Sequence, residues 1–90
     1  MKFTVVWIPA SEAQLATIWA SAFDRSAVTA AANAIDAMLR RDPIVRGETF
    51  SQTVRVLVEE PLLVKFVVDE DDRIVRVLTV ERVPVDPSRN

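Results

Sequence analysis

The 90-residue sequence has no cysteine, no histidine and no tyrosine. Without cysteine the chain forms no disulfide and offers no thiolate, which excludes a disulfide-stapled fold and cysteine-based catalysis. Without histidine it lacks the commonest zinc ligand and the commonest general base. These absences exclude most familiar catalytic arrangements, including every Ser-His and Cys-His pair, and no metal or cofactor is expected.

The chain also has no large excess of positive or negative charge and no long apolar run. The formal net charge is −2, so no strong positive field attracts the chain to nucleic acid or to an anionic membrane. No apolar run approaches the roughly 18–20 residues of a membrane span, and the N-terminus lacks the pattern of a signal peptide. Hydrophobic residues nonetheless make up 50% of the chain, which is typical of a folded domain. We expect a cytoplasmic protein with a single domain over residues 1–83 and a short flexible tail over residues 84–90.

The N-terminal region predicts a strand followed by a helix. β-branched and aromatic residues occupy both faces of residues 3–8, which favours a strand that is partly covered on both sides. Pro9 ends this strand, and Ser11-Glu12-Ala13-Gln14 has the form of a capping box at the start of a helix. The predicted helix covers about residues 11–22. Its apolar positions recur at helical spacing: Leu15, Ile18, Trp19 and Ala22.

A second helix is predicted between Asp24, as its N-cap, and the terminating pair Asp42-Pro43. Its apolar residues continue the helical period over three turns: Val28, Ala31, Ala32, Ile35, Met38 and Leu39. Because only two or three residues separate the two helices, they should form an antiparallel hairpin. Both tryptophans, Trp7 and Trp19, are expected to lie in the core.

The second half of the chain predicts a loop and three strands. Residues 44–53 include the only glycine, Gly47, and their broken pattern indicates a loop. The β-branched segments 54–59, 62–69 and 73–83 are separated by short, turn-like stretches, so they should form an antiparallel meander. The predicted fold is α+β in the order β-α-α-β-β-β, with the helical hairpin on one face of a small antiparallel sheet.

Acidic residues in the turns and loops offer little chemistry. Four consecutive carboxylates, Asp69-Glu70-Asp71-Asp72, lie between the last two predicted strands. Calcium loops need glycine and ligands spread over about a dozen residues, so a solvated hairpin turn is favoured over a metal site. Glu48, in the predicted loop, is interpreted as a solvated carboxylate because nothing in the sequence pairs it with an acid.

Several segments follow one another in the order of a known family. The N-terminal strand runs into Pro9-Ala10-Ser11-Glu12, and the second helix contains Ile35-Asp36-Ala37-Met38-Leu39. The three C-terminal segments are the most specific: Val54-Arg55-Val56-Leu57, Leu63-Val64-Lys65-Phe66-Val67-Val68-Asp69-Glu70 and Arg73-Ile74-Val75-Arg76-Val77-Leu78. Together, over about residues 3–83, they resemble the RelE/ParE superfamily of bacterial type II toxins, known from plasmid-stabilisation and addiction modules.

The resemblance implies a small toxin that is neutralised by a co-expressed antitoxin. One branch of the superfamily cleaves ribosome-bound mRNA, and another poisons DNA gyrase. The ribonuclease branch relies on basic residues of the sheet face and the last strand, often with a C-terminal tyrosine or histidine. Here Arg55 matches a basic position of the second strand, whereas the arginine that often opens the next strand falls on Leu62. The arginine near the end of the last strand falls on Val83, or on Arg82 if the register shifts by one residue.

Three cations are the candidate catalytic residues, one on each strand of the predicted meander: Arg55, Lys65 and Arg82. If Arg55 and Lys65 lie opposite each other, they form a small phosphate-binding spot. The alternative, which we favour, is that these cations are outward-facing strand residues paired with Glu59 and Glu81.

A second basic group follows the second helix and consists of Arg40, Arg41 and Arg46. These arginines either bind a partner, namely nucleic acid or an acidic segment of the antitoxin, or only complement the C-terminal end of the helix dipole. The sequence does not choose between the two.

Three functions remain open. The first is an antitoxin-controlled toxin, with a gyrase-type or divergent target favoured over mRNA cleavage because tyrosine and histidine are absent. The second is a non-toxic descendant that serves as a protein-interaction domain. The third is a ribosome-dependent mRNA endoribonuclease that works with the three strand cations alone.

Overall fold

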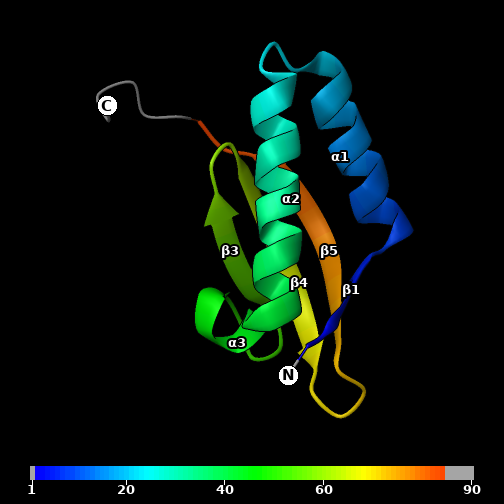
Figure 1. The fold of residues 1–90 in the computed structure, drawn as a ribbon, viewed down its shortest axis with the longest axis vertical. Coiled ribbons are helices and arrows are strands. Elements are labelled where there is room, and N and C mark those ends of the chain that lie inside the picture. Colours follow the sequence, from blue (N-terminus) through cyan, green and yellow to red (C-terminus); the bar gives the residue numbers. More distant parts are fainter. Residues whose placement is uncertain (1, 85–90) are drawn as a thin grey trace.

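The computed structural model describes residues 2–84, and Figure 1 shows two helices lying side by side across one face of a sheet. Along the chain the elements are β1 (Thr4–Trp7), α1 (Pro9–Ser21), α2 (Arg25–Arg41), α3 (Pro43–Arg46), β2 (Glu48–Thr49), β3 (Arg55–Glu59), β4 (Leu62–Asp69) and β5 (Ile74–Arg82). The strands form one five-stranded sheet in the order β1-β5-β4-β3-β2. β1 runs parallel to β5 and the other neighbours are antiparallel. The predicted α+β class, the helical hairpin and the meander are confirmed.

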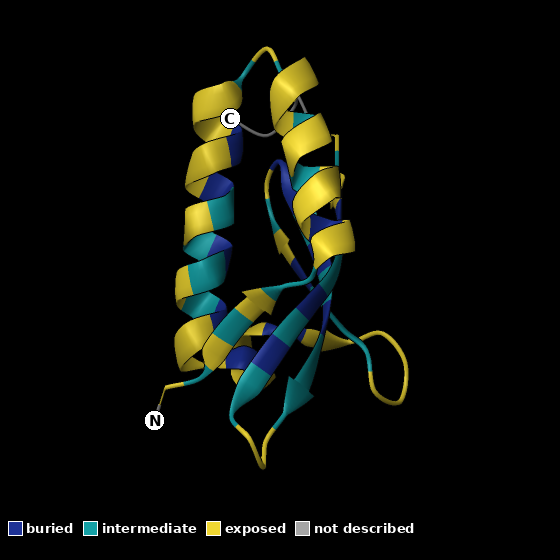
Figure 2. Cartoon of the chain, turned by 90° about the vertical axis from the view of Figure 1, so that its right-hand side faces the viewer, coloured by how far each residue is buried: buried dark blue, intermediate teal, exposed yellow. Residues whose placement is uncertain are grey.

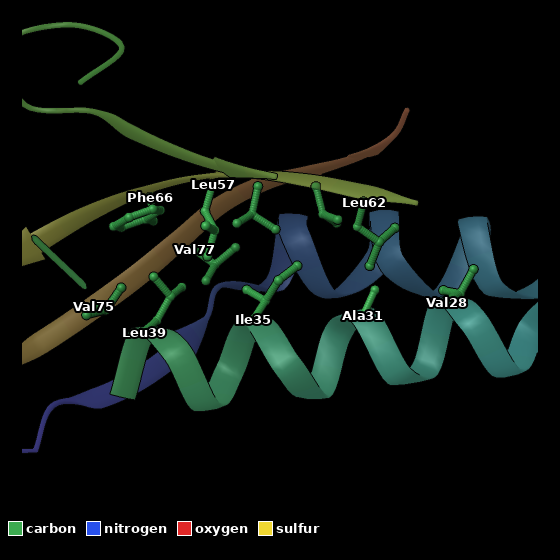
Figure 3. Packing of buried hydrophobic residues seen from close by; sticks show 11 residues of the cluster. Val28, Ala31, Ile35, Leu39, Leu57, Leu62, Phe66, Val75 and Val77 are labelled. Carbon is green, nitrogen blue, oxygen red and sulfur yellow. The ribbon is translucent and has the colours of Figure 1, made fainter. Parts of the chain in front are cut away.

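The core lies between α2 and the centre of the sheet. In α2 the buried residues recur every three or four positions, so one stripe of the helix faces the sheet: Val28, Ala31, Ile35 and Leu39. Figure 3 shows these side chains pointing at the strands, where they meet fully buried residues such as Leu62, Phe66 and Val77. Burying one such large apolar side chain contributes about 1.5–3 kcal/mol. This stripe therefore fixes α2 on the sheet.

α1 buries fewer of its side chains than α2. Figure 2 shows mostly exposed surface along α1, and Ser11 is its only buried residue. Leu15, Ile18 and Ala22 are partly buried and pack against the edge of the core. The connection between the two helices consists of residues 22–24, as the predicted hairpin requires. One side of α1 is therefore exposed.

The predicted capping box is wrong. α1 begins at Pro9 instead, with Ile8 as the N-cap, because proline has no amide hydrogen to lose and its fixed φ suits the first helical turn. Ser11 consequently lies inside the helix, where its hydroxyl donates to the Ile8 carbonyl oxygen at 2.9 Å. Gln14 does not reach back to the helix start; its Oε1 accepts a hydrogen bond from the Val80 amide at 2.9 Å.

The predicted loop at residues 44–53 is also only partly correct. It contains most of the short helix α3 and the two-residue edge strand β2, which pairs with β3. Both elements were too short to leave a periodic signal in the sequence. Gly47 joins them, and a methyl group at this position would collide with the ring of Phe66. Glycine is therefore required here by close packing.

One face of the sheet is left uncovered by the helices. In β1 the residues Val5 and Trp7 are partly buried, whereas Thr4 and Val6 are exposed, so the expected cover on both sides of this strand is absent in the described chain. The strand register places four further residues on the same open face: Arg76, Val67, Lys65 and Val56.

The predicted tail lies outside the described residues apart from Pro84.

Candidate functional site

The structure does not bring the three predicted strand cations together. In the antiparallel ladder Arg55 pairs with Phe66, while Lys65 pairs with Val56. Side chains of successive residues point to opposite faces of a sheet, so Arg55 points to the helical side with Phe66, and Lys65 points to the open face. The predicted phosphate-binding spot formed by Arg55 and Lys65 is therefore wrong.

Arg55 instead closes the end of α3. Its Nη2 atom donates to the backbone carbonyl oxygens of Ile44 and Gly47 at 2.5 Å each. Carbonyls in the last turn of a helix have no partner within the helix, and a guanidinium satisfies them well. The expected pairing with Glu59 is wrong, and within residues 2–84 the buried Nε atom of Arg55 has no hydrogen-bond partner.

Arg82 also points to the helical side, because of an irregularity in β5. Lys65 pairs with Thr79 but Phe66 pairs with Val77, so Leu78 is an extra residue that forms a β-bulge. The bulge reverses the alternation of β5 and directs Arg82 toward the hairpin connection, where its Nη2 lies 2.7 Å from the Asp24 carboxylate. The hydrogen bond from Arg82 lowers the pKa of Asp24. Its guanidinium also lies 5.4 Å from the ring centre of Phe23.

The open face carries two cations, Lys65, which the sequence predicted as a candidate, and Arg76, which it did not. Lys65 and Arg76 lie in neighbouring rows of this face, on β4 and β5. The Lys65 ammonium lies 4.2 Å from the ring centre of Phe50, and the Arg76 guanidinium lies 3.9 Å from the Asp69 carboxylate. The expected pairing of the strand cations with Glu81 is absent from the ion pairs of the described residues. Arg76 could have been found from its position between Val75 and Val77, both of which are fully buried.

The second basic group does converge. Arg40, Arg41 and Arg46 line one hollow of about 370 Å³, together with Lys2, which the sequence analysis did not select. Asp36 and Asp42 also line it, and Arg40 is tied to Asp36 at 2.6 Å. Arg41 and Arg46 are exposed and form no ion pair with any residue that the structure describes. We call this feature the basic hollow.

Backbone contacts assemble the basic hollow from three parts of the chain. Pro43 ends α2 and opens α3, and that single turn returns the chain so that Arg46 faces the end of α2. The Phe3 amide donates to the carbonyl oxygen of Arg40 at 2.8 Å, which holds the start of the chain, and with it Lys2, beside the arginines. Residues far apart in the sequence thus contribute to one positively charged surface.

A groove between α1 and α2 adjoins the basic hollow. It has a volume of about 530 Å³ and a largely apolar lining that includes Trp7, Leu15, Trp19, Val28 and Ala32. The prediction that Trp19 belongs to the core is wrong: 45% of its surface is exposed, and its Nε1 donates to the Thr29 hydroxyl at 3.1 Å. Trp7 packs against the core as predicted. We call this feature the helical groove.

The acidic stretch and Glu48 behave as structural surface residues. Residues 70–73 form a turn in which Asp69 Oδ1 accepts a hydrogen bond from the Asp72 amide at 3.1 Å, which confirms the predicted hairpin turn. Glu48 is exposed on the edge strand β2, opposite Val56.

In the part of the chain that the structure describes, no helix is both long and apolar enough to cross a membrane.

Solved structures share this architecture over nearly the whole chain. A chain of the toxin–antitoxin complex RelBE2 from Mycobacterium tuberculosis matches with a TM-score of 0.77 and 14% identity, over 91% of this chain and 99% of that one. A chain of the chromosomal ParDE TA system from P. aeruginosa matches with a TM-score of 0.70 and 16% identity, over 92% of this chain and 98% of that one. The fold is RelE/ParE-like. Neither a family model nor a curated protein matches the sequence.

The structure shows where the residues lie that were matched to the basic positions of the family. Leu62, which stands where an arginine often opens the strand, is fully buried in the core. Arg55 and Arg82 hold the helical layer in place, and Val83 follows the end of β5. Among residues 2–84, the cations on the open face of this RelE/ParE-like sheet are therefore Lys65 and Arg76.

Proposed function

We propose that this chain is the toxin component of a toxin–antitoxin pair and that a protein antitoxin neutralises it. The observation that supports this proposal is the RelE/ParE-like fold over nearly the full length of the chain and of both neighbours. Those neighbours come from systems described as toxin–antitoxin, RelBE2 and ParDE.

Within this proposal, a gyrase-type or divergent target is favoured over mRNA cleavage. Cleavage of RNA needs groups that move protons and stabilise charge on the phosphate. The chain has neither tyrosine nor histidine, and two of its three candidate cations, Arg55 and Arg82, are engaged in contacts on the helical side. Lys65 and Arg76 remain on the open face, where two cations can bind a phosphate but no tyrosine or histidine stands beside them to move a proton.

The test is growth of a bacterial host after induction of the chain alone and together with its neighbouring gene. We expect growth arrest that the neighbour relieves, followed by altered plasmid supercoiling without new transcript ends. New transcript ends at ribosome-bound mRNA would contradict the target preference. Normal growth with folded, abundant protein would instead favour a non-toxic protein-interaction domain.

A pair of variants connects the test to the open face. Lys65→Gln with Arg76→Gln removes both open-face cations, whereas Gln52→Glu with Thr53→Glu makes the same change in net charge on an exposed loop. We expect the first pair to weaken growth arrest and the second pair to leave it intact, at equal amounts of folded protein. Equal arrest by both would exclude the open face as the target-binding surface.

A further inference from the structure

The helical groove and the basic hollow are parts of one surface. Asn33 and Asp36 line both of them, so the two features meet along α2. Asp36 is bonded on both sides of this junction: its Oδ2 lies 2.6 Å from Arg40, and its Oδ1 accepts a hydrogen bond from Trp7 Nε1 at 3.4 Å. A ligand that lies in the groove is therefore directed into the hollow.

We propose that this continuous surface binds an amphipathic helix of a protein partner, with a cluster of acidic residues at the end that enters the basic hollow. The proposal rests on the proposed function in taking the occupant to be a protein partner; the chemistry of that partner comes from the surface itself. An apolar groove between two helices accepts the apolar face of a third, as in other helix-in-groove complexes.

The charges of the hollow determine which end of the ligand is acidic. Four cations and two carboxylates line the basic hollow, which leaves an excess of positive charge on a chain whose net charge is −2. Asp36 already engages Arg40, whereas Arg41 and Arg46 are exposed and form no ion pair within the described part of the chain. Guanidinium groups bind carboxylates through paired hydrogen bonds, so acidic side chains complement this end of the surface.

The apolar end has the side chains of a binding hot spot. Trp19 is 45% exposed at the groove, and the Arg25 guanidinium lies 4.7 Å from its ring centre. Tryptophan and arginine are enriched among residues that dominate binding energy in protein interfaces. A nucleic acid is less well matched, because the largely apolar groove that leads into the hollow offers nothing to a charged backbone.

Binding to this surface can be followed by the intrinsic tryptophan fluorescence of the chain. Its two tryptophans, Trp7 and Trp19, both line the helical groove, and no tyrosine contributes to the emission. Intrinsic fluorescence therefore follows occupancy of the groove directly. The probes are two synthetic helical peptides with the same leucine-rich face, one with a run of glutamates at one end and the other with lysines there.

We expect the glutamate peptide to shift the tryptophan emission and to bind at least about tenfold more tightly than the lysine peptide. Arg41→Gln with Arg46→Gln should weaken it by about tenfold or more, while the charge-matched pair Gln52→Glu with Thr53→Glu should not. Ala16→Glu, which places a carboxylate in the groove, should abolish binding, whereas Ala10→Glu on the same helix should preserve it. Equal affinity for the two peptides, or unchanged binding by the Ala16→Glu variant, would overturn the proposal.

Other occupants give different outcomes. Tighter binding of a single-stranded RNA oligonucleotide through Arg41 and Arg46 would overturn the proposal in favour of a phosphate site. Self-association that Ala16→Glu abolishes would overturn it in favour of a second copy of this chain. Peptide binding without growth arrest would contradict only the proposed function, and growth arrest relieved by the neighbour without peptide binding would contradict only this inference.

Discussion

The Arg82 guanidinium lies 2.7 Å from the carboxylate of Asp24, a residue 58 positions earlier in the chain. This ion pair joins the end of the last strand to the connection between the two helices. Asp24 stands at the N-cap position of α2, but its side chain makes no capping hydrogen bond there. Its carboxylate serves the tertiary contact with Arg82 instead, so the contact holds the helical hairpin against the sheet.

The Asp24–Arg82 ion pair should make stability depend on pH in the acid range. The hydrogen bond from Arg82 lowers the folded-state pKa of Asp24, whereas in the unfolded chain an aspartate titrates near about 3.9. The stabilisation is therefore complete above the unfolded pKa and is lost as the pH falls through the lowered folded pKa. We expect Asp24→Asn to lower the melting temperature at neutral pH and to match the unsubstituted protein at the acid end of a pH series. Asp71→Asn, in the exposed turn, is the control, and a difference that persists in strong acid would contradict the assignment.

Gly47 should tolerate no larger residue. A methyl group at this position would overlap the Phe66 ring, and inserting atoms into a packed core costs about 1–3 kcal/mol. We expect Gly47→Ala to lower the free energy of unfolding in urea by about that amount. In a Phe66→Leu background the same substitution should cost less, because the smaller side chain makes room for it. Additive effects of the two substitutions would show that the Phe66 ring is not the cause.

Arg55 should matter for stability, not for contact with a target. Its guanidinium satisfies two carbonyl oxygens at the end of α3, and charge-assisted hydrogen bonds contribute about 1.5–3 kcal/mol each. Because a lysine side chain is shorter and does not carry its ammonium as far as the Arg55 Nη2 atom, Arg55→Lys should lower the free energy of unfolding measurably. Lys65→Gln, on the open face, should change it by less than about 0.5 kcal/mol. The reverse order of effects would restore Arg55 as a candidate catalytic residue.

The sequence predicted the elements far better than the direction of their side chains. Strong periodicity located α2 and the three long strands, since one apolar stripe or one apolar face must be buried in each. The position of Arg55 was also within reach: counting outward from the two-residue turn Glu60-Pro61 gives the observed pairing of Arg55 with Phe66. A short register count would have rejected the phosphate-binding spot.

Arg82 could not be assigned in the same way. A strict alternation from Val75 and Val77 would direct Arg82 to the open face with Arg76. The bulge at Leu78 reverses this direction. β5 contains no glycine that would have indicated a bulge in the sequence. The basic hollow was similarly predictable only in part, because Arg40, Arg41 and Arg46 are close in sequence, whereas Lys2 reaches them through a tertiary hydrogen bond of Phe3.

Gln14 should protect one backbone amide at the edge of the sheet. β1 pairs with Ile74–Val77, and within residues 2–84 no strand lies beside the outer edge of β5 beyond that point. There Gln14 Oε1 supplies the acceptor for the Val80 amide. An amide left without a partner at a partly buried edge costs about 1 kcal/mol and exchanges faster with solvent. We expect Gln14→Ala to accelerate hydrogen exchange at Val80, while Gln14→Glu, which keeps an acceptor oxygen in place, should retain the protection. Unchanged exchange in Gln14→Ala would mean that α1 shields this edge of β5 by packing alone and that the Gln14 hydrogen bond is not what protects the Val80 amide.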